Sequence, residues 1–90
     1  MSAEKQRMTV LNRLSAEYPA SVPLEELRKD AALHDADFRR VVAYLEEKAL
    51  IDIDDLKEGV DGVFGVARIT AAGLDCVESG ARRVRASWLR

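Results

Sequence analysis

Residues 23–53 read PLEELRKDAALHDADFRRVVAYLEEKALIDI, and three patterns follow one another in this stretch. The first is a short helix beginning at Pro23, a residue that is tolerated in a first helical turn. The second is a longer helix, which Leu33-His34-Asp35 separates from the first. The third begins after Leu50, where apolar and acidic residues alternate over residues 51–54 as in a strand with one buried face. A short helix, a tight turn and a longer helix have the spacing of a helix-turn-helix.

Apolar residues recur at helical spacing in both helices, which predicts one buried face for each. The predicted buried faces are Leu24, Leu27 and Ala31 in the short helix, and Phe38, Val41, Val42, Leu45 and Ala49 in the longer one. His34 or Asp35 is the candidate N-cap of the longer helix.

Another helix is predicted on the N-terminal side, from about Ala3 to Tyr18. Its apolar stripe consists of Met8, Val10, Leu11, Leu14 and Tyr18. Pro19 ends this helix, because proline lacks an amide hydrogen and forces the preceding residue toward extended geometry. Residues 20–22 leave room only for a turn or a very short strand.

A hairpin and a last helix are predicted on the C-terminal side. The polar, glycine-containing residues 55–62 supply the turn, and residues 63–69 form the second strand. Thr70 is the expected cap of the last helix, with Ala71, Leu74 and Val77 as its inner residues.

The resulting order is helix, short strand, helix, helix, strand, loop, strand, helix. This order resembles the winged helix-turn-helix family of small DNA-binding domains. The resemblance covers residues 8–78, and three stretches carry it: Pro23–Leu27, Tyr44–Ile51 and Ile69–Leu74. The resemblance implies a mostly α-helical fold with a small antiparallel hairpin, the wing. Ala49 stands where the family usually has glycine, so we expect this helix to end without a left-handed turn.

At 90 residues, the chain is long enough for one domain. We assign residues 1–79 to the winged domain and residues 80–90 to a basic extension that continues the last helix. The extension has four arginines and no acid, whereas residues 1–79 have ten basic and sixteen acidic side chains.

The reactive residues are few: His34 is the only histidine and Cys76 the only cysteine. A lone thiol is typical of the reducing cytoplasm, and one Cys with one His cannot form a structural zinc site. No apolar run approaches the ~20 residues of a membrane span. We therefore expect a cytoplasmic protein without enzymatic activity, cofactor, metal or membrane.

The resemblance implies that the longer helix enters the major groove of DNA. Its side opposite Phe38 carries Ala36, Arg40 and Ala43, with Arg39 and Tyr44 at the flanks. Arg40 could reach guanine O6 and N7, while Arg39 and Tyr44 could reach the phosphate–sugar backbone. Further phosphate contacts are expected from Arg28, Lys29 and Arg13.

A protein-interaction module that does not bind DNA is the alternative. Acids surround the two arginines of the longer helix, and the predicted wing carries Asp54, Asp55, Glu58 and Asp61 against Lys57. Such a wing repels phosphates, whose neutralisation supplies most non-specific affinity for DNA. The acidic wing would instead bind a protein partner.

The last helix predicts a homodimer, because its apolar stripe continues past Gly80. The stripe includes Val77, Ala81, Val84 and Trp88. Winged-helix regulators often pair through terminal helices, and the resemblance implies the same here. Phe64 is also assigned to the dimer contact, since the second strand is apolar on both faces. A frayed basic tail is the alternative for these last residues.

Overall fold

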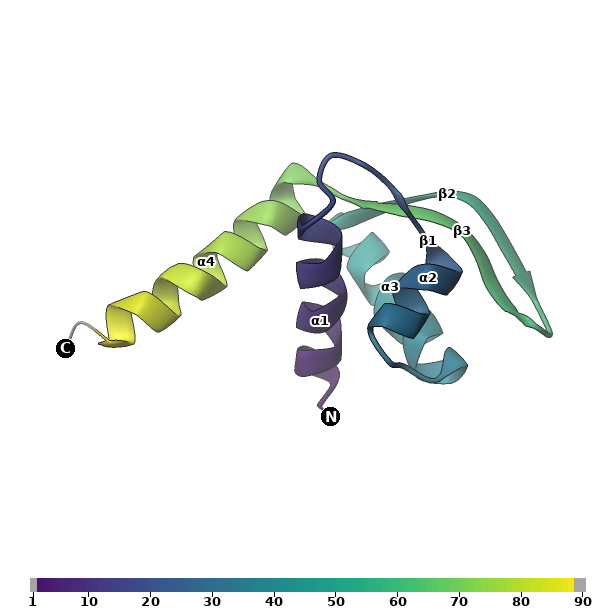
Figure 1. The fold of residues 1–90 in the computed structure, drawn as a ribbon, viewed down its shortest axis with the longest axis horizontal. Coiled ribbons are helices and arrows are strands. Elements are labelled where there is room, and N and C mark those ends of the chain that lie inside the picture. Colours follow the sequence, from purple (N-terminus) through teal and green to yellow (C-terminus); the bar gives the residue numbers. More distant parts are fainter. Residues whose placement is uncertain (1, 89–90) are drawn as a thin grey trace.

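The computed structural model describes residues 2–88, with side chains described as far as Gly80. The elements are α1 (Ala3–Ser15), β1 (Val22–Pro23), α2 (Leu24–Asp30), α3 (Asp35–Glu47), β2 (Ile51–Gly59), β3 (Gly62–Ile69) and α4 (Ala71–Trp88). Figure 1 shows α2 and α3 beneath the curved β2–β3 hairpin, α1 beside them, and α4 leading away from the others. The predicted fold class is confirmed.

The sheet has three antiparallel strands in the order β1-β3-β2. β1 contributes only two pairs, Val22 with Ala67 and Pro23 with Val66. The inner face of β3 is buried at Val63, Ala67 and Ile69, and it closes one side of the core. The helices supply most of the remaining core residues: Val10, Leu11, Leu14, Leu24, Leu27, Ala31, Phe38, Val41, Val42 and Leu45.

Ala49 ends α3 in the left-handed conformation, with φ of 58°. The expectation that alanine would end this helix differently is therefore wrong, as is the predicted burial of Ala49, which is exposed. The amide of Leu50 donates to the Leu45 carbonyl at 2.9 Å, and that of Ala49 donates to the Glu46 carbonyl at 2.9 Å. These two bonds form a Schellman motif, which satisfies carbonyls at the helix end and offsets the strain of a left-handed alanine.

The end of α2 repeats this arrangement at Ala32, with φ of 54°. The Leu33 amide donates to the Arg28 carbonyl at 3.2 Å, and the Ala32 amide donates to the Lys29 carbonyl at 3.0 Å. Two successive helices of the helix-turn-helix thus end on a left-handed alanine.

The hairpin is longer than predicted, because β2 continues to Gly59 and the turn is only Val60–Asp61. The predicted turn over residues 55–62 is therefore wrong. A β-bulge between Asp54 and Lys57 interrupts the pairing of β2 with β3, and the pairing resumes at Lys57. Gly65 lies opposite with φ of 136°, and a Cβ there would lie 2.8 Å from the Asp54 carbonyl oxygen. Glycine at this position lets the two strands approach at the bulge.

α1 ends at Ser15, three residues before the predicted end, and Tyr18 is 44% exposed. The Glu17 and Tyr18 amides donate to carbonyls three residues back, which tightens the chain into turns and takes Tyr18 off the buried stripe.

Thr70 caps α4 as predicted, since its Oγ1 accepts a hydrogen bond of 3.1 Å from the Gly73 amide. The same hydroxyl donates to the Ala49 carbonyl at 2.8 Å, which ties the start of α4 to the end of α3. Gly73 is buried and Ala71 is exposed, so the prediction of Ala71 as an inner residue is wrong. A Cβ on Gly73 would lie 2.3 Å from the Leu50 carbonyl oxygen, so only glycine permits this approach.

α4 crosses Gly80 without a break and reaches Trp88. The division of the chain at residue 79 stays a prediction. Within residues 2–88, none of the helices combines the length and the hydropathy required to cross a bilayer.

Candidate nucleic-acid interface

The outward face of α3 carries Ala36, Arg40, Ala43 and Glu47, all exposed. The apolar residues on the opposite side of the helix are buried, so α3 has the orientation that its sequence pattern predicts. Arg40 forms no ion pair with the described side chains of residues 2–80. The two alanines leave the helix backbone close to the molecular surface on either side of this arginine.

Positive side chains gather where α3 meets α1. The guanidinium carbon of Arg7 lies 4.1 Å from the centre of the Tyr44 ring, and Lys48 Nζ lies 5.8 Å from the same centre. Arg7, Arg40 and Tyr44 also line one hollow, together with residues of the first two turns of α1. We call Arg7, Arg40, Tyr44 and Lys48 the tyrosine cluster.

Arg7 and Lys48 were not among the sequence-predicted interface residues. Lys48 follows Tyr44 at the i, i+4 spacing, which is a detectable signal for two side chains on one helix face. Arg7 has no such signal, because only the packing of α1 against α3 brings it to Tyr44.

The other flank of α3 faces the hairpin. Arg39 Nε donates to Asp35 Oδ2 at 2.8 Å, and Arg39 Nη2 donates to the Gly59 carbonyl at 2.7 Å. One guanidinium thus joins the first turn of α3 to the tip of β2. The exposed charges of this hairpin are mostly acidic: Asp52, Asp54, Asp55, Lys57, Glu58 and Asp61.

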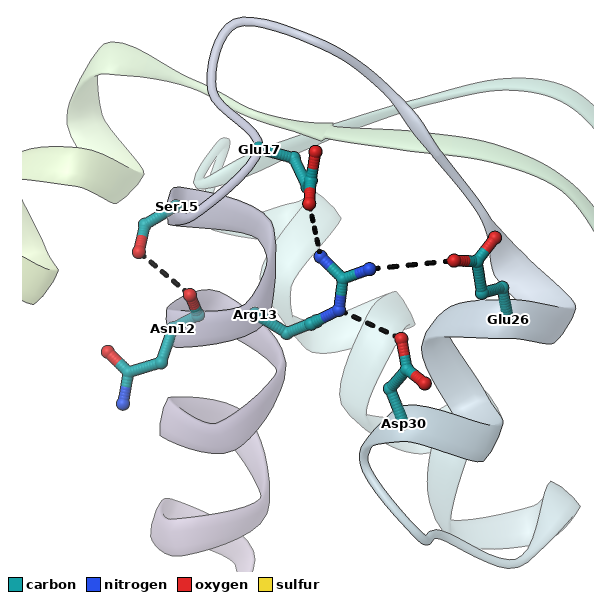
Figure 2. A network of polar contacts seen from close by, with 6 residues as sticks. All are labelled: Asn12, Arg13, Ser15, Glu17, Glu26 and Asp30. Carbon is teal, nitrogen blue, oxygen red and sulfur yellow. Dashed lines mark hydrogen bonds and ion pairs between the residues drawn. The ribbon is translucent and has the colours of Figure 1, made fainter.

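Arg13 is surrounded by three carboxylates at the junction of α1 and α2 (Figure 2). Its nitrogens lie 2.8 Å from Asp30, 3.2 Å from Glu17 and 3.5 Å from Glu26. The hydrogen bond that Arg13 donates to the Asp30 carboxylate raises the pKa of Arg13 above its usual value. Arg13 therefore links two helices and has its donors engaged.

Arg28 and Lys29 lie on α2, whereas the tyrosine cluster is formed by α1, α3 and the residue that follows α3. Arg28 Nη1 donates to the Leu33 carbonyl at 3.3 Å and is partly buried. Lys29 forms a longer ion pair of 3.7 Å with Glu25, and its side chain is 65% exposed.

The structure brings half of the predicted interface residues together on the outward face of α3: Ala36, Arg40, Ala43 and Tyr44. Arg39 lies at the edge of this face. The other predicted residues lie on other elements: Arg13, Arg28 and Lys29.

Of the residues predicted for dimerisation, the structure describes the side chains of two, and these lie on different elements. Val77 is partly buried and packs against the core of its own domain. Phe64 is 41% exposed on the outer face of β3. The side chains of Ala81, Val84 and Trp88 lie outside the described side chains.

Among the described residues, no three His, Cys, Asp or Glu side chains converge as a metal site would require. Cys76 is exposed on α4 and His34 is exposed at the start of α3.

Comparison with known proteins supports the fold. No protein-family model and no curated protein sequence matches the chain. Among solved structures, it resembles the crystal structure of a MepR mutant from a multidrug-resistant S. aureus clinical isolate, with a TM-score of 0.71 and 16% identity. The match covers 93% of this chain and 61% of that one, so this chain spans less than two thirds of MepR. The element order, the three-stranded sheet and this likeness together identify the chain as having the winged helix-turn-helix fold.

Proposed function

We propose that this chain binds double-stranded DNA through α3 and acts as a small regulator of transcription. The observation that carries the proposal is the outward face of α3, where Arg40 is exposed between two alanines and lacks an acidic partner among the described side chains. MepR is itself a winged-helix regulator, which supports this assignment over that of an interaction module. Binding to DNA agrees with the cytoplasmic location expected from the sequence.

α3 suits the major groove in size. Its 13 residues span about 20 Å, and a helix enters a groove roughly 12 Å wide. Small side chains at positions 36 and 43 allow the backbone to approach the bases, so that the Arg40 guanidinium can form two hydrogen bonds with guanine O6 and N7. Tyr44, 37% exposed, lies one turn further along and would contact sugar or phosphate.

The other predicted phosphate contacts differ in how easily they could form. Lys29 would have to leave one exposed ion pair, which is worth about 0.3–0.5 kcal/mol at this spacing. Arg13 would have to leave three carboxylates, and Arg39 would have to release the hairpin. We therefore assign phosphate contact on α2 to Lys29, with Arg28 beside it, and we retain Arg13 and Arg39 as residues that position the binding surface.

We also propose that the chain acts as a homodimer joined through α4. The second half of α4 extends beyond the rest of the domain (Figure 1), and its sequence continues the apolar stripe of Val77 with Ala81, Val84 and Trp88. A twofold pair would present two α3 helices to successive turns of a duplex, about 34 Å apart. Sedimentation of the wild type, Trp88→Ala and Phe64→Ser tests this. A wild type that is monomeric at tens of micromolar contradicts the dimer.

Fluorescence polarisation with a labelled random-sequence duplex tests DNA binding directly. The wild type should bind at low salt and weaken steeply as salt rises, because phosphate contacts release counterions. Absence of binding at low salt, where charges are least screened, would refute the proposal and favour a protein partner.

The role of Arg40 needs a second measurement, on duplexes enriched by the wild type from a random pool. Arg40→Ala should lose about 1–3 kcal/mol of affinity for the enriched duplex and much less for the random pool. Arg68→Ala is the matched control, since Arg68 pairs with Asp52 across β2 and β3 and does not lie on α3. Equal losses on both duplexes would show that Arg40 contacts phosphate and not a base.

A further inference from the structure

The cations that lack an acidic partner are unevenly distributed over this domain. Residues 2–80 include ten lysines and arginines, and four of these pair with carboxylates: Arg13, Lys29, Arg39 and Arg68. Arg28 donates to a backbone carbonyl. Among the described side chains, this leaves Lys5, Arg7, Arg40, Lys48 and Lys57, and three of these belong to the tyrosine cluster.

The way Arg7 is held leaves it able to bind an anion. A carboxylate partner occupies the N–H donors of an arginine, as it does at Arg13. An aromatic ring instead attracts the face of the guanidinium, and the donors around its edge stay available. Tyr44 thus orients Arg7 without using its hydrogen-bonding capacity. Glu4 and Glu47, the nearest acids along α1 and α3, form no ion pairs with the described side chains.

The two flanks of α3 therefore have opposite charge. A helix in the major groove lies between two phosphate backbones, one on each flank. On the α1 flank, a backbone would meet Arg7 and Lys48. On the hairpin flank, it would meet acidic side chains around Lys57, and Arg39 is already engaged with Gly59 and Asp35.

We infer that Arg7 and Lys48, oriented around Tyr44, form the principal DNA phosphate contact of this domain, and that the β2–β3 hairpin does not supply it. This inference rests on the proposed DNA binding through α3. It makes α1 part of the interface. The phosphates of one DNA strand are then held at the α1–α3 junction, and the acidic hairpin lies away from the phosphates of the other DNA strand.

The test is the salt dependence of binding to a random-sequence duplex, measured by polarisation. Each phosphate contact removed should reduce the slope of log affinity against log salt by about one. Arg7→Gln and Lys48→Gln should each have this effect, and the double variant should lose about two. Tyr44→Phe keeps the ring and every charge, so it should keep the wild-type slope, although loss of the hydroxyl lowers the affinity. Tyr44→Leu removes the ring and should reduce the slope as Arg7→Gln does.

Two single-charge controls accompany these variants. Lys5→Gln removes a charge from the same helix as Arg7 but two residues away, where side chains do not share a face. Lys57→Gln removes the basic residue of the hairpin. Both should keep the wild-type slope, and circular dichroism should show the same helix content in all variants.

The outcomes separate this inference from the proposal on which it rests. A wild type that fails to bind duplex at low salt overturns the proposed function itself. A wild type that binds, with an unchanged slope for Arg7→Gln and Lys48→Gln and a reduced slope for Lys57→Gln, overturns the inference alone and assigns the phosphate contact to the hairpin.

Discussion

Replacing Ala49 with glycine should stabilise the fold, although it removes a methyl group and adds no contact. Ala49 has φ of 58°, and its side chain is exposed, so the methyl group contributes no core packing. An L-residue other than glycine pays about 1–2 kcal/mol for left-handed geometry. Glycine loses about 0.5–1 kcal/mol more backbone entropy on folding. The difference predicts a net gain of about 0.5–1 kcal/mol in the free energy of unfolding.

Urea denaturation measures this gain as a higher midpoint with an unchanged slope, since the surface exposed on unfolding is the same. Ala43→Gly is the matched control: Ala43 is also exposed, but it lies in the interior of α3, where glycine should cost about 1 kcal/mol. Ala32→Gly should reproduce the gain at the end of α2, because its φ of 54° is nearly the same. If Ala49→Gly were neutral or destabilising, then strain in the left-handed alanine would not limit the stability of this helix end.

Three further outcomes are expected. Gly73→Ala should destabilise the fold by about 1–3 kcal/mol in urea denaturation, because the added Cβ would lie 2.3 Å from the Leu50 carbonyl oxygen; a loss near zero would mean that α4 shifts freely. Arg39→Met should raise amide hydrogen exchange at the hairpin tip, residues 58–62, while leaving exchange in α1 unchanged; unaltered exchange at the tip would show that Arg39 does not hold it. Arg13→Gln should lower the urea midpoint more at low salt than at high salt, since its three ion pairs are partly exposed and therefore screened; an equal loss at both would assign the effect to packing.

Hydrophobic periodicity was sufficient to predict the helices of the helix-turn-helix and the buried side of α3. The apolar stripe of a helix must face the core, and therefore the exposure of Ala36, Arg40 and Ala43 on the other side followed from the same pattern. The cap at Thr70 was likewise local and was found correctly.

What the sequence could not predict depended on contacts between distant residues. The length of the hairpin depends on pairing beyond a bulge, where Gly65 permits close approach to Asp54. The position of Arg7 over Tyr44 depends on how α1 packs on α3. Whether an arginine is engaged also depends on elements that fold against it, as Arg13 shows.

The close junction at Gly73 and Thr70 fixes the direction in which α4 leaves the domain. Thr70, which directly precedes α4, donates hydrogen bonds to the carbonyls of Ala49 and Leu50, just after α3, so the two helices meet at one corner. α4 has 18 residues and is about 27 Å long, and a tilt of roughly 10° at that corner moves its far end by about 5 Å. In the proposed pair joined through α4, such a tilt would change the separation of the two α3 helices while leaving their outward side chains in place.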